Sequence, residues 1–194
     1  MNKKYLELKI QLLDIKPSVY RTIQISADAT FFDLHVSIQF AFDWENSHLH
    51  SFMVNDKEIG NLEMDEFGEM DILDQSEIQL KEFLVFEKQK CIYIYDFGDN
   101  WEHEITLMKF IEPNSSYYPK CVRGARNRPP EDCGGVWGFE QFKEIMGSRK
   151  HPEFKEMKAW YGGMFDEEYF DKSAVNSKFQ EFETFKHFMY EAEY

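Results

Sequence analysis

Alternation of apolar and polar residues is the clearest signal at the start of the chain, and it predicts an antiparallel hairpin. Over residues 5–13, leucine and isoleucine occupy every second position, and polar side chains dominate the positions between them. A second alternating stretch covers residues 19–25, after a break at Pro17. Because successive side chains of a strand point to opposite faces, each stretch indicates a half-buried strand.

A helix is predicted next, over residues 31–42. Thr30 and Asp33 fit a capping box, in which the two side chains satisfy free amide groups at a helix start. Apolar residues then recur at helical spacing, which predicts a single apolar face. Residues 48–54 form a third predicted strand, with two histidines on the same face.

The rest of the chain predicts a second hairpin followed by helices. Residues 55–77 are acidic and predict at most short strands, and residues 78–88 are ambiguous between helix and strand. Residues 91–111 form the second hairpin, and residues 112–137, rich in proline and glycine, form a long ordered loop. Helical segments are expected near 138–147, 151–161, 166–172 and 174–190.

These elements predict a single α+β domain over residues 1–194. An antiparallel sheet with one long helix forms a sheet-rich core over residues 1–112, in an order similar to a β-grasp arrangement. Residues 113–194 add the loop and a helical extension. Hydrophobic residues make up 43% of the 194-residue chain, which is enough for a core without disulfide or metal staples.

Charge and cysteine content narrow the classes of function. The chain has 22 basic and 36 acidic residues, so its net charge of −14 repels the phosphate backbones of nucleic acids. The chain has only three cysteines, it has no apolar run of membrane-spanning length, and its start does not resemble a signal peptide. We therefore expect a cytoplasmic protein without a membrane anchor.

The turn of the second hairpin carries more ionisable groups than a turn needs. We expect it to lie beside the third strand, where side chains could hold zinc, manganese or iron, or act as acid and base. The alternative is a structural network in which the carboxylates cap the turn and the histidines bond to them. The candidate site residues are His48, His50, Asp96, Asp99, Glu102 and His103, and all of these except Glu102 are candidate metal ligands.

Arg123, Arg126 and Arg128 form a basic group in an otherwise acidic chain. They are a candidate anion-binding site, since arginine pairs well with phosphate and carboxylate oxygens. The alternative, which we favour, is that they pair with acidic residues of the same chain and so relieve its self-repulsion.

Several strings carry a family resemblance. Trp44 and His48-Leu49-His50-Ser51-Phe52 precede Tyr-Asp-Phe-Gly-Asp-Asn-Trp-Glu-His at 95–103 and Pro-Pro-Glu-Asp-Cys-Gly-Gly at 129–135. The chain resembles the Ri-plasmid "ORF-three"-like family, whose members are also labelled TnpR-like passenger proteins of an insertion element. The resemblance covers nearly the whole chain and implies a fold and a link to mobile elements, but no established biochemical function.

Two hypotheses of function remain open at this point. The first is a binding or adaptor module with a protein partner. The second is a metal-dependent hydrolase that uses His48, His50, Asp96, Asp99 and His103. The sequence leaves undecided whether any catalysis occurs, and it gives no substrate.

The TnpR-like label of the family denotes a resolvase, which would have to bind DNA, and the sequence argues against such binding. We expect no complex with random duplex DNA in a mobility-shift assay at physiological salt, because the chain lacks a basic recognition helix. A salt-sensitive complex in the low micromolar range, lost when Arg123, Arg126 and Arg128 are changed to alanine, would contradict this expectation. Non-specific DNA binders typically show a Kd of about 10⁻⁴ to 10⁻⁶ M.

Overall fold

The computed structural model describes residues 5–62, 71–112 and 119–193, so part of the acidic stretch 55–77 lies outside the described residues. Within these ranges the chain forms one eight-stranded sheet and six helices, and the predicted α+β class is confirmed. The strands are β1 (Tyr5–Leu12), β2 (Tyr20–Ser26), β3 (His50–Val54), β4 (Lys57–Gly60), β5 (Ile72–Asp74), β6 (Lys90–Tyr95), β7 (Trp101–Ile111) and β8 (Lys120–Ala125). The helices are α1 (Phe31–Phe42), α2 (Leu80–Phe83), α3 (Gly135–Gly147), α4 (Phe154–Tyr161), α5 (Lys172–Phe179) and α6 (Phe182–Glu193).

The strands lie across the sheet in the order β5-β4-β3-β6-β7-β1-β2-β8. Neighbours are antiparallel, except for the parallel pair β4 and β5. Both predicted hairpins form, and β6 of the second one pairs with β3, with Tyr95 opposite His50. The β6–β7 hairpin therefore lies beside the third strand, as expected, and separates it from β1.

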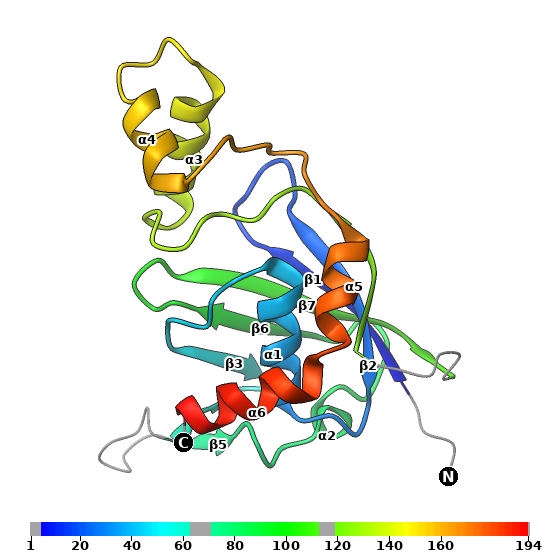
Figure 1. The fold of residues 1–194 in the computed structure, drawn as a ribbon. Coiled ribbons are helices and arrows are strands. Elements are labelled where there is room, and N and C mark those ends of the chain that lie inside the picture. The colour runs from blue at the N-terminus through cyan, green and yellow to red at the C-terminus, as the bar shows by residue number, and fades with distance from the viewer. Residues whose placement is uncertain (1–4, 63–70, 113–118, 194) are drawn as a thin grey trace.

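Helix α1 begins and ends where the sequence predicts, but it is enclosed on every side. The capping box is present, with the Asp33 amide donating to Thr30 Oγ1 (3.1 Å) and the Thr30 amide donating to Asp33 Oδ2 (2.8 Å). All 12 residues of the helix are buried, so the expected single apolar face is wrong. The reason is visible in Figure 1, where the sheet lies on one side of α1 and helices α5 and α6 cover the other.

The C-terminal half differs most from the sequence prediction. Residues 120–125, expected in a loop, form β8 because they pair with the free edge of β2. Residues 166–171 contain a turn at residues 167–168 rather than a helix, and α5 begins at Lys172. The helix expected at 174–190 is divided into α5 and α6 at residues 180–181. Helices α3 and α4 end where predicted, but α3 begins three residues earlier and α4 three residues later than expected. The two helices make a separate lobe above the sheet (Figure 1).

The core between α1 and the sheet is rich in aromatic rings. Trp44 stacks on Tyr95, with ring centroids 4.8 Å apart, and both Trp44 and Trp101 are buried. His103 on β7 is also in this core: its ring meets those of Trp44 and Tyr93, and its Nδ1 bonds to the Trp101 carbonyl (2.9 Å). None of the described helices is both long and apolar enough to cross a bilayer.

Replacing Trp101 with alanine is expected to destabilise the fold by about 3–5 kcal/mol, because only 1% of this residue is exposed. Trp137→Ala is the matched control. Trp137 is 88% exposed, so its loss should change the free energy of unfolding by no more than about 0.5 kcal/mol. Urea unfolding of both variants measures the difference, and equal midpoints would contradict the placement of Trp101 in the core.

His103 makes the fold sensitive to acid. Burial lowers the pKa of this imidazole to about 3, so between pH 6.5 and pH 3 the unfolded chain takes up a proton that the native one excludes. Stability should fall with decreasing pH in this window, by up to about 1.4 kcal/mol per pH unit from this group. His103→Gln should therefore unfold with a shallower pH dependence than the wild type, measured in urea from pH 7.5 to pH 4.5.

The control for this measurement is His187→Gln, at an exposed position on α6. Its unfolding free energy should run parallel to that of the wild type across the same pH range. If the His103 variant also runs parallel to the wild type, the buried imidazole does not contribute the expected proton linkage.

Candidate functional site

Three segments that are far apart in the sequence meet and form the candidate site. They are the loop after α1 (residues 43–49), the β6–β7 turn (residues 96–100) and the loop before α3 (residues 126–134). Each segment contributes at least one ionisable side chain. We call the group that they form the His48 cluster, and its members are His48, Asp96, Glu131 and Asp132.

Specific hydrogen bonds hold the three segments together. Trp44 Nε1 donates to the carbonyl of Pro129 (3.2 Å), which ties the first segment to the third. The amide of Gly134 donates to Asp99 Oδ2 (3.1 Å), which ties the third segment to the hairpin turn. The cluster is therefore a product of tertiary contacts between loops, each anchored by a buried strand or helix.

His48 lies at the centre of the cluster. Its Nε2 is 3.1 Å from Asp132 Oδ1 and 3.7 Å from both Asp96 Oδ2 and Glu131 Oε2. This nitrogen is inaccessible to solvent, yet it makes no hydrogen bond. His48, Asp96 and Asp132 place donor atoms within 4.8 Å of one another, which is close enough to share one ion.

Asp96 has two separate roles, one for each carboxylate oxygen. The residue has a positive φ of 56°, and its Oδ1 accepts hydrogen bonds from the amides of Gly98 (2.9 Å) and Asp99 (3.3 Å). This is the turn-capping role of an aspartate at a tight turn. The other oxygen, Oδ2, is left to face His48.

Glu131 is held in the same way. Its Oε1 accepts from the amide of Glu45 (2.9 Å), and the Tyr95 hydroxyl is shared between Oε1 (3.3 Å) and Oε2 (3.4 Å). Oε2 also faces His48. Burial raises the pKa of the Glu131 carboxyl, since the charged form loses hydration. Burial and the neighbouring Glu131 charge also raise the pKa of Tyr95, so its hydroxyl stays protonated and donates.

The glycines of the Pro-Pro-Glu-Asp-Cys-Gly-Gly string allow the loop before α3 to approach its neighbours closely. A Cβ at Gly135 would come within 2.5 Å of the Asp99 carbonyl oxygen, and the φ of Gly135 is +65°. A Cβ at Gly138 would come within 1.7 Å of the Cys133 carbonyl oxygen. Only glycine fits at these two positions, so they fix α3 against both the hairpin turn and its own preceding loop.

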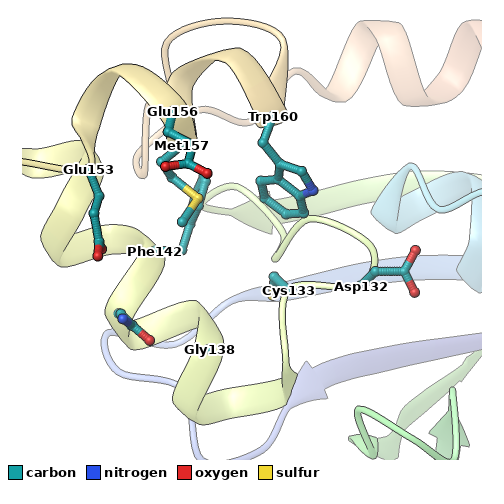
Figure 2. Close-up of a pocket in the computed structure, with 9 residues that line it drawn as sticks. Asp132, Cys133, Gly138, Phe142, Glu153, Glu156, Met157 and Trp160 are labelled. Atoms are coloured by element: carbon teal, nitrogen blue, oxygen red, sulfur yellow. The ribbon is translucent and has the colours of Figure 1, made fainter.

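A groove opens next to the cluster, between α3, α4 and the loop before α3 (Figure 2). It encloses a cavity of about 400 Å³. In Figure 2 the Trp160 ring lies over Cys133, and the Asp132 carboxylate points away from Phe142 and Met157. Asp132 thus belongs both to the groove and to the His48 cluster. The lining residues of this α3–α4 groove are Asp132, Cys133, Gly138, Gln141, Phe142, Glu153, Glu156, Met157 and Trp160.

The structure brings His48 and Asp96 together but separates His50 from them. The chain bends at His48, and β3 begins only at His50, so the alternation of a strand does not extend to His48. His50 faces α1 instead. Its ring stacks on that of His35, with centroids 3.4 Å apart, and its Nε2 bonds to Gln75 Oε1 (2.7 Å).

The remaining candidates also lie outside the His48 cluster. Asp99 accepts the Gly134 amide, and Glu102 Oε1 accepts from the side chain of Asn100 (3.0 Å). His103 is in the aromatic core. Within the described residues, only His48, Asp96 and Asp132 form a group of three whose donor atoms could hold one metal ion.

Two of the three candidate anion-binding arginines are bonded within the protein. Arg126 pairs with Glu168 (3.1 Å), and Arg128 donates to the carbonyls of Phe42 (3.1 Å) and Asp43 (2.9 Å) at the end of α1. Arg123 is exposed on β8. This arrangement orients Arg126 and Arg128 towards internal partners rather than towards a common anion.

Sequence reasoning did not place Glu131 and Asp132 in the site, although both lie in one of the strings that carry the family resemblance. Local patterns could not show that this string folds against His48. The sequence also gave no indication of a role for Arg21. This residue is buried and donates to the carbonyls of Ala41 (2.8 Å) and Arg126 (2.9 Å). Burial lowers the pKa of Arg21 to about 10, which leaves it charged at neutral pH.

Comparison with known proteins gives relatives without an assigned activity. An uncharacterised protein, y4hQ, of Sinorhizobium fredii (strain NBRC 101917 / NGR234) is 31% identical over 170 residues, which cover 87% of this chain and 84% of the relative. A crystal structure of MM3350, a protein of unknown function from Methanosarcina mazei Go1, is similar with a TM-score of 0.79 and 36% identity, covering 89% of this chain and 98% of the other. The family model described as plasmid pRiA4b ORF-3-like protein matches residues 4–174, and the chain belongs to that family.

Proposed function

We propose that this chain is a binding module, an adaptor that holds a basic segment of a partner protein on α3 and α4. The observation that carries the proposal is the exposure of large side chains on this lobe. Trp160, which lines the α3–α4 groove, is 50% exposed. Trp137 on α3, outside the residues that line the groove, is 88% exposed, and Met164 in the segment after α4 is 49% exposed. Tryptophan and methionine are enriched at protein interfaces, where they bury much apolar surface.

The α3–α4 groove supports a partner of this chemistry. Phe142 and Met157 provide apolar walls, and the Trp160 ring meets Phe142 edge-on, with centroids 5.9 Å apart. Every charged residue that lines the groove is acidic, namely Asp132, Glu153 and Glu156. Among the described residues, none of these three carboxylates forms an ion pair with a lysine or arginine.

A segment with lysine or arginine next to a bulky apolar residue would match both features. Its cations would meet the carboxylates at the rim, and its apolar side chain would enter beside Trp160. The same acidic lining disfavours nucleic acid, because it repels phosphates. The charge of the groove therefore supports a protein partner over a nucleic-acid one.

The hydrolase alternative has less support from the geometry. It requires His48, His50, Asp96, Asp99 and His103 to converge on one substrate. His50 and His103 are instead buried and bonded within the core, where a substrate has no access. A binding role requires no such convergence.

A library of random twelve-residue peptides displayed on phage tests the proposal. Selection on the immobilised protein, with a chelator present, should enrich peptides with lysine or arginine beside aliphatic or aromatic residues. Fluorescence anisotropy with an enriched peptide should then show at least about a tenfold loss of affinity for Trp160→Ala, the scale expected of an interface hot spot. A Glu153→Gln, Glu156→Gln double variant should weaken binding and reduce its salt dependence.

Phe86→Ala is the control, since Phe86 is an exposed aromatic residue that does not line the groove. This variant should bind the peptide as the wild type does. Enrichment of acidic peptides, or equal binding by the wild type and Trp160→Ala, would refute the proposed docking site.

A further inference from the structure

We propose that the His48 cluster binds one divalent transition-metal ion, with His48, Asp96 and Asp132 as ligands and Glu131 as a fourth donor. Metal binding at the His48 cluster is a different chemistry from the binding of a protein segment in the α3–α4 groove. The proposed metal site does not depend on that binding. The cluster supplies one imidazole nitrogen and up to three carboxylate oxygens from three different segments of the chain.

One of the three distances from His48 matches the spacing of ligands around a metal, and the other two exceed it by a few tenths of an ångström. With metal–ligand bonds of about 2.1 Å, neighbouring donor atoms are about 3.0–3.4 Å apart in octahedral or tetrahedral geometry. The nitrogen of His48 lies 3.1 Å from Asp132 and 3.7 Å from Asp96 and Glu131. The donor atoms of His48, Asp96 and Asp132 all lie within 4.8 Å of one another, and Glu131 approaches this group through its contact with His48.

The hydrogen bonding of His48 is the second observation. Its Nε2 is closed off from solvent and surrounded by three carboxylates, yet it donates no hydrogen bond to any of them. A network of hydrogen bonds would satisfy this nitrogen directly. An unsatisfied buried nitrogen facing carboxylate oxygens is instead the arrangement of a ligand set whose shared cation lies between the donors.

The supporting contacts preorganise this set. Asp96 uses Oδ1 for backbone amides and leaves Oδ2 to face His48. Glu131 uses Oε1 for the Glu45 amide, and its Oε2, which faces His48, is also held by the Tyr95 hydroxyl (3.4 Å). Ligand carboxylates in metal sites are commonly oriented in this way by a surrounding layer of hydrogen bonds. The Asp132 side chain, 71% exposed, leaves one side of the site open to water or to a further ligand.

The donor types favour zinc or manganese over magnesium and calcium. A nitrogen ligand suits borderline metals, whereas magnesium and calcium prefer sites made of oxygen alone. The group of donor atoms close enough to share one ion does not include the nearby thiol of Cys133.

Isothermal titration calorimetry with ZnCl₂ and with MnCl₂ tests this site on the full chain after removal of metal by a chelator. We expect one equivalent of one of these metals to bind the wild type and to raise its Tm. His48→Ala and Asp132→Asn should each weaken the binding by at least about tenfold and abolish the rise in Tm. Asp132→Asn keeps the test decisive even if His48→Ala fails to fold, because the Asp132 side chain is largely exposed.

His187→Ala is the matched control, because His187 is exposed on α6 and lies 3.3 Å from Glu191, outside the cluster. Its metal affinity should equal that of the wild type. The inference is overturned if the wild type binds neither metal, or if Asp132→Asn binds metal as tightly as the wild type. Loss of binding in the His187 variant would also overturn it, since the metal would then occupy an exposed surface histidine.

Discussion

Complete burial of α1 is the constraint on which the rest of the structure depends. A helix enclosed on all sides must have partners for every polar group, including the carbonyls of its last turn. That turn contains no basic residue of its own. Arg21 from β2 and Arg128 from the loop before α3 supply the donors, to the carbonyls of Ala41 and Phe42. Both guanidinium groups also complement the negative end of the helix dipole.

The position of the candidate site follows from this arrangement. Arg128 fixes the loop before α3 at the end of α1, and three residues later the same loop presents Glu131 to His48. The hairpin turn closes the third side through the bond between Asp99 and the Gly134 amide. Ionisable groups are thus concentrated where three loops meet, next to α1, which is buried along its whole length.

The two proposed ligands, a metal ion and a basic protein segment, are both positively charged. They differ in the size and chemistry of the binding site that each requires. A metal ion needs a few fixed donors at short distance, which the His48 cluster offers. A protein segment needs a wide surface with large apolar side chains, which the α3–α4 groove and the exposed Trp137 offer. Asp132 belongs to both features, because it lines the groove and also contacts His48.

The sequence by itself determined the elements whose stabilising contacts are local. Alternation placed β1 and β2, the capping box of Thr30 and Asp33 placed the start of α1, and turn residues placed the β6–β7 hairpin. Tertiary structure decided the rest: β8 formed because β2 offered a free edge, and α1 lost its polar face when α5 and α6 covered it. It also decided the site, since His48 and Asp96 were candidates from sequence, but Glu131 and Asp132 joined them only through contacts between distant segments. Periodicity and turn chemistry report interactions over a few residues, and they carry no information on which loops meet across the fold.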